Sequence, residues 1–115
     1  MSTAKTTAIP DSLNQRVAIT TWPALLASET GEPVEAAQFA DRSVQISGSF
    51  GGASVIVEGS NDGVSYFPLT DPQGNSLTFT ASKLEAVTEL TRWLRPRVSG
   101  GDGTTEIAFV LLAKW

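Results

Sequence analysis

Alternating apolar and polar positions are the main pattern along this chain of 115 residues. Val44 and Ile46 occupy every second position of one run, and Val55 and Val57 do so in the next. A period of two predicts strands with one buried face. The pair Gly51-Gly52 between the runs predicts a type I′ turn, because glycine readily adopts the positive φ that both central positions need. We therefore expect a β-meander here, which a second turn at residues 61–63 extends into a third run over residues 64–69.

Further strand-like runs precede and follow this meander. Residues 16–22 predict a first strand, with Val17, Ile19 and Thr21 on one face and Pro23 ending it. A long connection over residues 24–40 follows, and loops of that length in a compact domain are usually functional or braced against a neighbour. Residues 71–74 (DPQG) predict a type I turn, after which residues 76–80 alternate again as a strand.

The C-terminal third predicts one helical turn and two more strands. Ser82 and Glu85 have the spacing of a capping box, which favours a short helical turn over residues 83–90. Residues 91–98 predict a strand, and Pro96 places it at an edge or beside a bulge, because proline cannot donate to a ladder. Residues 105–112 predict the last strand. Short strands separated by turns favour an all-β, antiparallel β-sandwich.

The last predicted strand is apolar on both faces. Ile107, Phe109 and Leu111 point to one side, while Val110 and Leu112 point with Ala108 to the other. Because only one face of a strand meets the core of a two-layer sandwich, an arm, a loop or another subunit must cover the second face. Together with the modest charged content of 17%, this predicts a homo-oligomer.

The N-terminal residues 1–15 predict an extended arm, separate from a sandwich domain over residues 16–115. Ile9, Pro10 and Leu13 are its bulky positions, and the rest is small and polar. Such a segment cannot bury enough surface to offset its ordering entropy by itself. We expect a neighbouring chain to order it, with Ile9 and Leu13 as anchors; an arm folded back on its own domain is the alternative.

Composition limits the chemistry that the chain can perform. The net charge of −4 argues against a nucleic-acid partner, and no apolar run reaches membrane-spanning length. The chain has no histidine and no cysteine. A carboxylate pair from Asp62 and Asp102 is conceivable, but turn aspartates more often bond their own backbone. We therefore expect no catalytic residue, no cofactor and no metal, and no enzyme.

Aromatic and basic side chains supply the candidate partner contacts. Trp93, Arg95 and Arg97 fall on one face of a predicted strand. Indole and guanidinium groups together recognise anions, sugars or carboxylates, although the alternative is a solvated edge with arginine stems lying on apolar surface. Trp22 and Trp115, near the two ends of the strand series, are further candidates because interfaces favour tryptophan.

Two stretches of the chain resemble the head decoration, or cement, proteins of tailed bacteriophages. They are residues 39–79 (FADRSVQISGSFGGASVIVEGSNDGVSYFPLTDPQGNSLTF) and residues 84–107 (LEAVTELTRWLRPRVSGGDGTTEI). The FGG and GSNDG turns are the most specific pieces. The resemblance implies a jelly-roll-like β-sandwich, commonly trimeric, on the outer capsid surface.

The resulting expectation is a structural virion protein, made in the bacterial host cytoplasm, that clamps neighbouring capsid subunits. Its partners would be the major capsid protein and two further copies of itself in a homotrimer, with no nucleic acid and no membrane. The alternative is a carbohydrate- or receptor-binding module of a phage head or tail fibre that uses Trp93 and its arginines.

Overall fold

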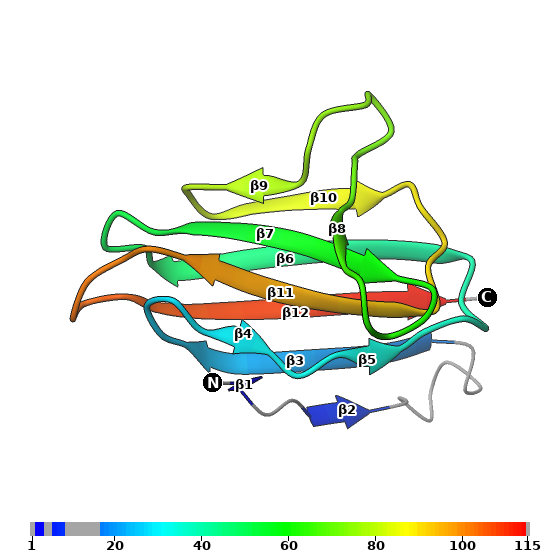
Figure 1. The fold of residues 1–115 in the computed structure, drawn as a ribbon, viewed down its shortest axis with the longest axis horizontal. Coiled ribbons are helices and arrows are strands. Elements are labelled where there is room, and N and C mark those ends of the chain that lie inside the picture. Colours follow the sequence, from blue (N-terminus) through cyan, green and yellow to red (C-terminus); the bar gives the residue numbers. More distant parts are fainter. Residues whose placement is uncertain (1, 4–5, 9–16, 115) are drawn as a thin grey trace.

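The computed structural model describes residues 2–3, 6–8 and 17–114, the first two segments by backbone only. These residues contain strands and turns but no helix, and they form two packed sheets (Figure 1). The pairing is antiparallel except between β1 and β4. The predicted all-β, jelly-roll-like sandwich is confirmed.

Each sheet combines strands that are distant in sequence. Sheet A has the order β1 (Ser2–Thr3), β4 (Thr30–Gly31), β11 (Trp93–Ser99), β7 (Ser54–Ser60) and β8 (Phe67–Pro68), with β5 (Val34–Glu35) beside β11 and β9 (Thr78–Phe79) beside β7. Sheet B has the order β10 (Lys83–Val87), β6 (Asp41–Ser49), β12 (Glu106–Lys114), β3 (Val17–Leu25) and β2 (Thr6–Ala8). The long strands β6, β12 and β3 therefore form the centre of sheet B.

The core lies between the sheets and consists of the alternating residues that the sequence predicted. Val44 and Ile46 from sheet B meet Val55 and Val57 from sheet A, and all four are buried. The rings of Trp22 and Phe109 pack edge to face with centroids 5.4 Å apart. Burying such side chains is the main favourable term in folding, at about 25 cal/mol per Å² of apolar surface.

The Gly51-Gly52 turn has the predicted conformation but a different role. Its φ angles are 55° and 84°, and the amide of Ala53 donates to the carbonyl of Phe50 at 2.8 Å. The flanking strands do not pair with each other, however, because β6 belongs to sheet B and β7 to sheet A. The predicted meander is therefore wrong at this point, and the turn carries the chain from one layer to the other.

Strand β3 is longer than predicted, and its buried face is the one opposite Val17, Ile19 and Thr21. Ala18, Thr20 and Trp22 are buried, whereas Val17, Ile19 and Thr21 are half-buried on the outside. The strand continues past Pro23, because the pairing with β12 shifts register between Ile107 and Phe109. This bulge lets Pro23 sit in the strand without donating to the ladder.

The helical turn predicted over residues 83–90 is wrong. Residues Lys83–Val87 form β10, which pairs with β6 through five residues. The backbone groups of residues 83–87 form their hydrogen bonds with β6, and not with one another as in a helical turn. This pairing also buries Val87 in the core. Tertiary pairing thus overrides the capping signal.

Pro96 lies inside sheet A and not at its edge. Strand β11 has β7 on one side and β4 and β5 on the other. The amide of Val98 donates to Glu29 on the second side, so by alternation the nitrogen of Pro96 also faces that side. The nitrogen of Pro96 faces the gap in sequence between β4 and β5, where the strand beside β11 is interrupted. Proline therefore costs no ladder hydrogen bond at this position.

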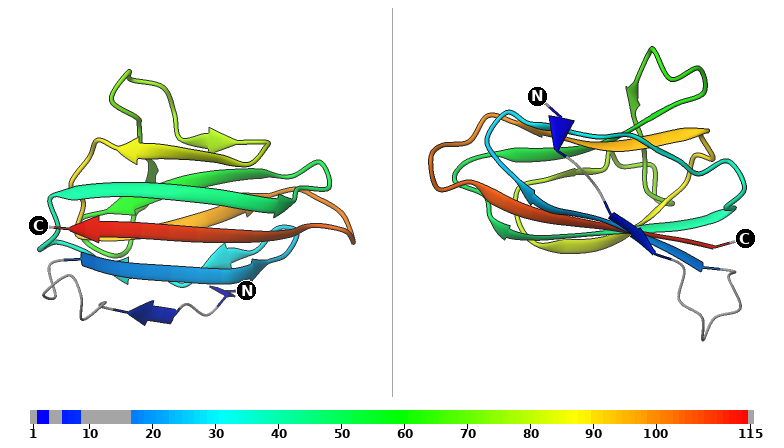
Figure 2. Two further views of the ribbon diagram at one scale, coloured as in Figure 1. Left: turned by 180° about the vertical axis from the view of Figure 1, so that it is seen from behind. Right: turned by 90° about the horizontal axis from the view of Figure 1, so that it is seen from below.

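The N-terminal strands add to both layers along the same side of the sandwich. β1 pairs with β4 in sheet A, and β2 pairs with β3 in sheet B, as the view from below in Figure 2 shows. In these two strands the backbone therefore follows the alternative expectation, that of an arm lying on its own domain. In the part of the chain that the structure describes, no helix is long and apolar enough to cross a membrane.

Candidate binding surface on the outer face of sheet A

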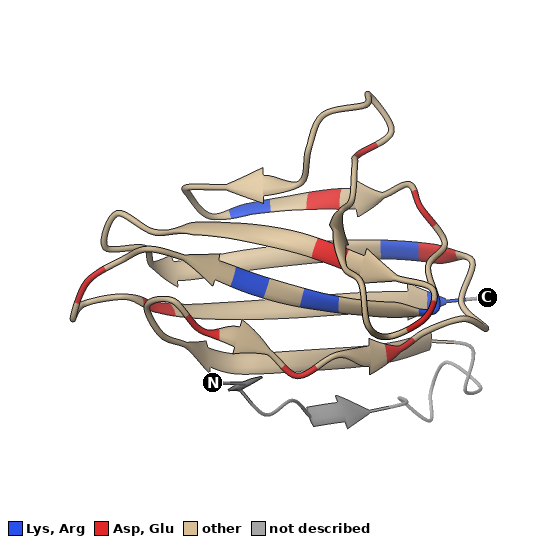
Figure 3. Ribbon diagram, viewed as in Figure 1, with Lys and Arg blue, Asp and Glu red and all other residues tan. Residues whose placement is uncertain are grey.

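Strand β11 presents the predicted trio of side chains to solvent. Trp93, Arg95 and Arg97 are partly exposed on one face, while Leu94 and Val98 on the other face are buried in the core. Figure 3 shows the two arginine positions as consecutive basic bands on β11, next to an acidic band on β7. The predicted division of residues 93–98 into an outward and an inward face is therefore confirmed.

A single carboxylate holds both arginines in place. Glu58 on β7 is only 5% exposed. Its Oε1 accepts from Nε of Arg95 at 3.0 Å, and its Oε2 accepts from Nε of Arg97 at 2.9 Å. One negative charge therefore meets two positive charges, and this part of sheet A keeps a net positive charge in an acidic protein. Within residues 17–114, neither guanidinium uses its terminal nitrogens on an acceptor, which leaves these donors for an acceptor outside this range.

The aromatic rings of this surface are already partly engaged. The guanidinium carbon of Arg95 lies 3.7 Å from the ring centroid of Tyr66, and that of Arg92 lies 5.8 Å from the ring of Trp93. Gly63, with φ of 79°, brings its backbone against the indole so closely that an added Cβ would lie 3.1 Å from Nε1 of Trp93. The loop over residues 61–66 therefore covers one side of Trp93.

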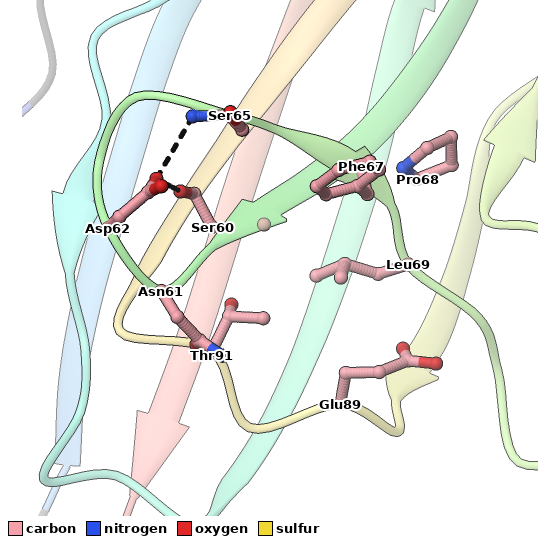
Figure 4. Close-up of a pocket in the computed structure, with 10 residues that line it drawn as sticks. Ser60, Asn61, Asp62, Ser65, Phe67, Pro68, Leu69, Glu89 and Thr91 are labelled. Atoms are coloured by element: carbon pink, nitrogen blue, oxygen red, sulfur yellow. Dashed lines mark hydrogen bonds between the residues drawn. The ribbon is translucent and has the colours of Figure 1, made fainter.

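A cavity of about 320 Å³ lies beside this loop (Figure 4). Phe67, 66% exposed, and Leu69 supply apolar surface, and the polar groups come from the loop and from the segment leading into β11. The complete lining consists of Gly59, Ser60, Asn61, Asp62, Ser65, Phe67, Pro68, Leu69, Glu89 and Thr91.

Both carboxylates of the cavity are bonded to their own chain. Oδ1 of Asp62 accepts from the amides of Val64 at 2.8 Å and Ser65 at 3.0 Å and from the hydroxyl of Ser60 at 2.9 Å. The backbone bonds from Ser65 and Val64, with the Ser60 hydroxyl, hold the pKa of Asp62 below its ordinary value. Because these bonds stabilise the ionised form, Asp62 is a loop-forming residue and a poor proton donor.

Glu89 is bonded in the same way. It accepts from the amide of Thr70 at 2.7 Å and from the Thr70 hydroxyl at 2.5 Å. Partial burial raises the pKa of Glu89, but the hydrogen bonds from Thr70 together outweigh it, so the net pKa is lowered. Neither carboxylate has the raised pKa that a general acid needs at neutral pH.

The carboxylate pair considered from the sequence is not brought together. Asp62 follows β7 beyond Ser60, whereas Asp102 follows β11 beyond Ser99, and the antiparallel register places these strand ends at opposite ends of the sheet. Asp102 accepts from the amide of Thr104 at 2.8 Å and from its hydroxyl at 2.6 Å. Each aspartate therefore shapes its own turn, as the alternative interpretation expected.

Sequence reasoning missed Arg42, which supports the segment that borders the cavity. Arg42 is 4% exposed and points from β6 to carbonyl groups of two connections. Its Nε donates to Phe39 at 3.1 Å, and its Nη2 donates to Ala36 and Thr91 at 2.7 Å each. A weaker contact of 3.5 Å joins Nη1 to the carbonyl of Glu89. The clue in the sequence was a charged residue at an inward position of a strand, two residues before Val44.

The other partner-contact candidates do not join this surface. Trp22 is fully buried in the core, where its Nε1 donates to the carbonyl of Glu32 at 3.0 Å, so the intact sandwich does not expose it to a partner. Ile9, Pro10, Leu13 and Trp115 lie outside the described residues. Within residues 17–114, no group of three or more Asp or Glu residues is placed to hold a metal ion.

Comparison with known proteins identifies the fold. No protein-family model matches the chain, and no curated protein matches it in sequence. Among solved structures, the SPBc2 prophage-derived protein YomS is similar, with a TM-score of 0.65, 13% identity and coverage of 84% of this chain and 93% of that one. A cupin domain from Bordetella pertussis has a TM-score of 0.53, 17% identity and coverage of 96% and 91%. Oxalate oxidase has a TM-score of 0.52 and 13% identity, with 99% of this chain covering 52% of that enzyme. At these identities the likeness establishes a jelly-roll-like β-sandwich and no activity.

Proposed function

We propose that this protein is a structural component of a bacteriophage virion that binds the outer surface of the capsid and stabilises it. Two lines support the phage assignment. The chain resembles phage head decoration proteins in residues 39–79 and 84–107. Its fold is similar to that of a prophage-derived protein over most of both chains. The proposal assigns the protein no catalytic activity.

The observation that carries this proposal is the state of the polar groups on sheet A. The carboxylates around the cavity bond their own backbone, whereas Arg95 and Arg97 are fixed by Glu58 and keep their terminal nitrogens for an outside acceptor. Such a surface suits recognition of a protein carboxylate, because guanidinium groups bind carboxylates in a fork geometry. Such a surface fits a protein whose role is to bind another protein.

The proposed mechanism is clamping of neighbouring capsid subunits. A contact through a small number of charge-assisted hydrogen bonds is weak by itself, but linked contacts add through effective concentration. A rigid sandwich that touches two or more major capsid protein subunits would hold them together without any change in its own fold. Self-association would increase this effect. The homotrimer implied by the sequence resemblance stays a prediction that a mass measurement decides.

Co-sedimentation with capsids tests the proposal. The wild-type protein should pellet with capsids of its parent phage in saturating, stoichiometric amounts and should raise their melting temperature. Arg97→Ala should weaken binding, and Lys83→Ala is the matched control because it removes an exposed cation from β10, in the other sheet. Failure of the wild-type protein to bind capsids would refute the proposed function. Equal binding by both variants would move the contact away from β11.

Carbohydrate recognition is the second candidate, and the partly exposed Trp93 with the 66% exposed Phe67 favours it. Sugars stack on aromatic faces beside fixed hydrogen-bond donors. If this is the function, the isolated protein should bind host-surface glycans, and Phe67→Ala should abolish binding. Leu90→Ala, which trims a side chain of similar exposure at 61%, should leave it intact. Lack of glycan binding by the isolated protein would exclude this candidate.

A further inference from the structure

The outer face of sheet B has an uncharged, largely apolar centre. Val110 and Leu112 on β12 lie beside Ile19 on β3, and with Ser43, Gln45 and Leu84 they line one groove of about 370 Å³. Leu84 is 63% exposed and Leu112 37%. In the view from behind in Figure 2, no other described element lies over these strands. A contiguous apolar patch of this kind on a sheet indicates an interaction surface.

On this face, the charged residues of β12 and of the neighbouring β6 lie only at the strand ends. Strand β12 begins with Glu106 and ends with Lys114, and the outward residues between them are Ala108, Val110 and Leu112. Asp41, the register partner of Lys114, also lies at the Lys114 end. The outward sequence is therefore acidic, small, branched, large and basic, with Val110 at its centre.

We infer that this face binds the same face of a second copy of the chain, with the two β12 strands antiparallel about a two-fold axis at Val110. This arrangement places Glu106 of each copy opposite Lys114 of the other. It also places the small Ala108 opposite the large Leu112. Sheets stack about 10 Å apart, a gap that glutamate and lysine side chains reaching from opposite sides can bridge.

The charge pattern selects this arrangement over the alternative. If the two-fold axis ran along the strands, Glu106 would face Glu106 and Lys114 would face Lys114, so like charges would repel each other at both ends of the interface. Thr21, Val110 and Gln45 are register partners across β3, β12 and β6. In the antiparallel arrangement they lie on the two-fold axis, so each of these uncharged residues faces the same residue of the second copy. The face is therefore self-complementary in charge and in size, as an isologous interface requires.

The size of the face approaches that of a stable interface. Strand β12 has nine residues. At about 3.3 Å per residue and about 4.8 Å between strands, the nine-residue strands β6, β12 and β3 and the five-residue β10 span a flat area of about 510 Å². Side-chain relief increases this accessible area towards the roughly 800 Å² per partner that stable interfaces bury. This dimer is independent of capsid binding, and it differs from the trimer implied by the sequence resemblance.

Sedimentation equilibrium of the full-length chain across a wide concentration range tests the inference. The wild type should be a dimer. Val110→Lys places two lysines at the two-fold axis and should weaken dimerisation by at least about a hundredfold. Val64→Lys is the matched control, because it makes the same change at a residue that is 82% exposed in the loop over residues 61–66. Circular dichroism should show that both variants keep the wild-type fold.

Charge reversal at the strand ends tests the geometry without touching the core. Glu106→Lys alone and Lys114→Glu alone should each weaken the dimer by about tenfold, because each replaces two exposed ion pairs per dimer with like-charge contacts. The double reversal Glu106→Lys with Lys114→Glu should restore it in an Asp41→Asn background, which removes the carboxylate at the register partner of position 114. A monomeric or trimeric wild type, or a Val110→Lys variant that still dimerises, would overturn the proposal. A double reversal that fails to restore dimerisation would overturn the antiparallel arrangement.

Discussion

Replacing Arg42 by methionine should be among the most destabilising single substitutions in this protein. The guanidinium of Arg42 is buried, has no carboxylate partner among residues 17–114, and is held by the carbonyls of Ala36, Phe39 and Thr91 at 2.7 to 3.1 Å. It joins a connection that leads into β6 to the segment that leads into β11, and so ties both sheets at one end of the sandwich. Burial lowers the pKa of Arg42, but an arginine stays protonated in any case.

The magnitude follows from these three short bonds. A hydrogen bond from a charged donor contributes about 1.5 to 3 kcal/mol, and removing the donor leaves buried carbonyls unsatisfied. The desolvation of the guanidinium, which methionine does not need, offsets part of this loss. We therefore expect Arg42→Met to lower the free energy of unfolding by about 3 to 5 kcal/mol. For a domain of this size each kcal/mol corresponds to about 4 °C, so the melting temperature should fall by about 12 to 20 °C.

Urea unfolding followed by tryptophan fluorescence measures the change, and Arg92→Met is the matched control. Arg92 is 58% exposed at its side chain and pairs with Glu35, itself 46% exposed. Exposed pairs of this kind contribute less than about 1 kcal/mol. Arg42→Lys separates charge from geometry, because lysine keeps the charge but not the planar fork of donors. If Arg42→Met costs no more than Arg92→Met, the carbonyl cluster does not hold the sheets together and the reasoning is wrong.

Four further predictions follow from the fold and the site. Glu58→Gln should cost about 1 to 2 kcal/mol, because Arg95 and Arg97 would then share a neutral amide; the more exposed Glu85→Gln should cost less in the same urea titration. The pKa of Asp62 is held below its ordinary value of 3.8 by its loop hydrogen bonds, so its contribution to stability is present above that pH and is lost as the pH falls through the lower folded pKa. Asp62→Asn should therefore flatten the acid limb of a plot of stability against pH. Deleting residues 1–15 removes strands β1 and β2, which are two and three residues long, so the melting temperature should fall by a few degrees while capsid binding falls strongly; global unfolding would instead make this segment essential to both sheets. EDTA should leave the melting temperature unchanged, and a drop of several degrees would reveal a cation site.

The features of the fold that local sequence patterns could predict are strands, turns and the inward face of most strands. Gly51-Gly52 specifies its turn because both positions need positive φ, and alternation specifies the buried sides of β6, β7 and β12. Local patterns do not say which strand pairs with which. The tight turn after β6 was therefore interpreted as a hairpin within one sheet, although it connects two sheets. For the same reason the capping box at residues 82–85 predicted a helical turn, although pairing with β6 makes this segment a strand.

The candidate surface could be predicted only in part. Trp93, Arg95 and Arg97 were found because they lie on one strand and share its outer face. Glu58, which fixes both arginines, lies 37 and 39 residues away from them, and only the pairing of β7 with β11 brings it close. Arg42 was missed because its partners are backbone carbonyls, which have no sequence signature. Contacts between distant segments are therefore what the structure adds.

The two outer faces of the sandwich differ in a way that separates their proposed roles. Sheet A offers fixed cations, whose contacts depend on ionic strength and on an acidic partner, whereas the centre of sheet B offers apolar side chains without charge. Raising the salt concentration should therefore weaken capsid binding through Arg95 and Arg97 more than it weakens self-association through Val110 and Leu112. Because the faces lie on opposite layers, a dimer formed through sheet B leaves the arginines of both copies exposed and pointing away from each other. Such a dimer would present two separate surfaces to capsid subunits, and this bivalence would strengthen the proposed clamp through effective concentration.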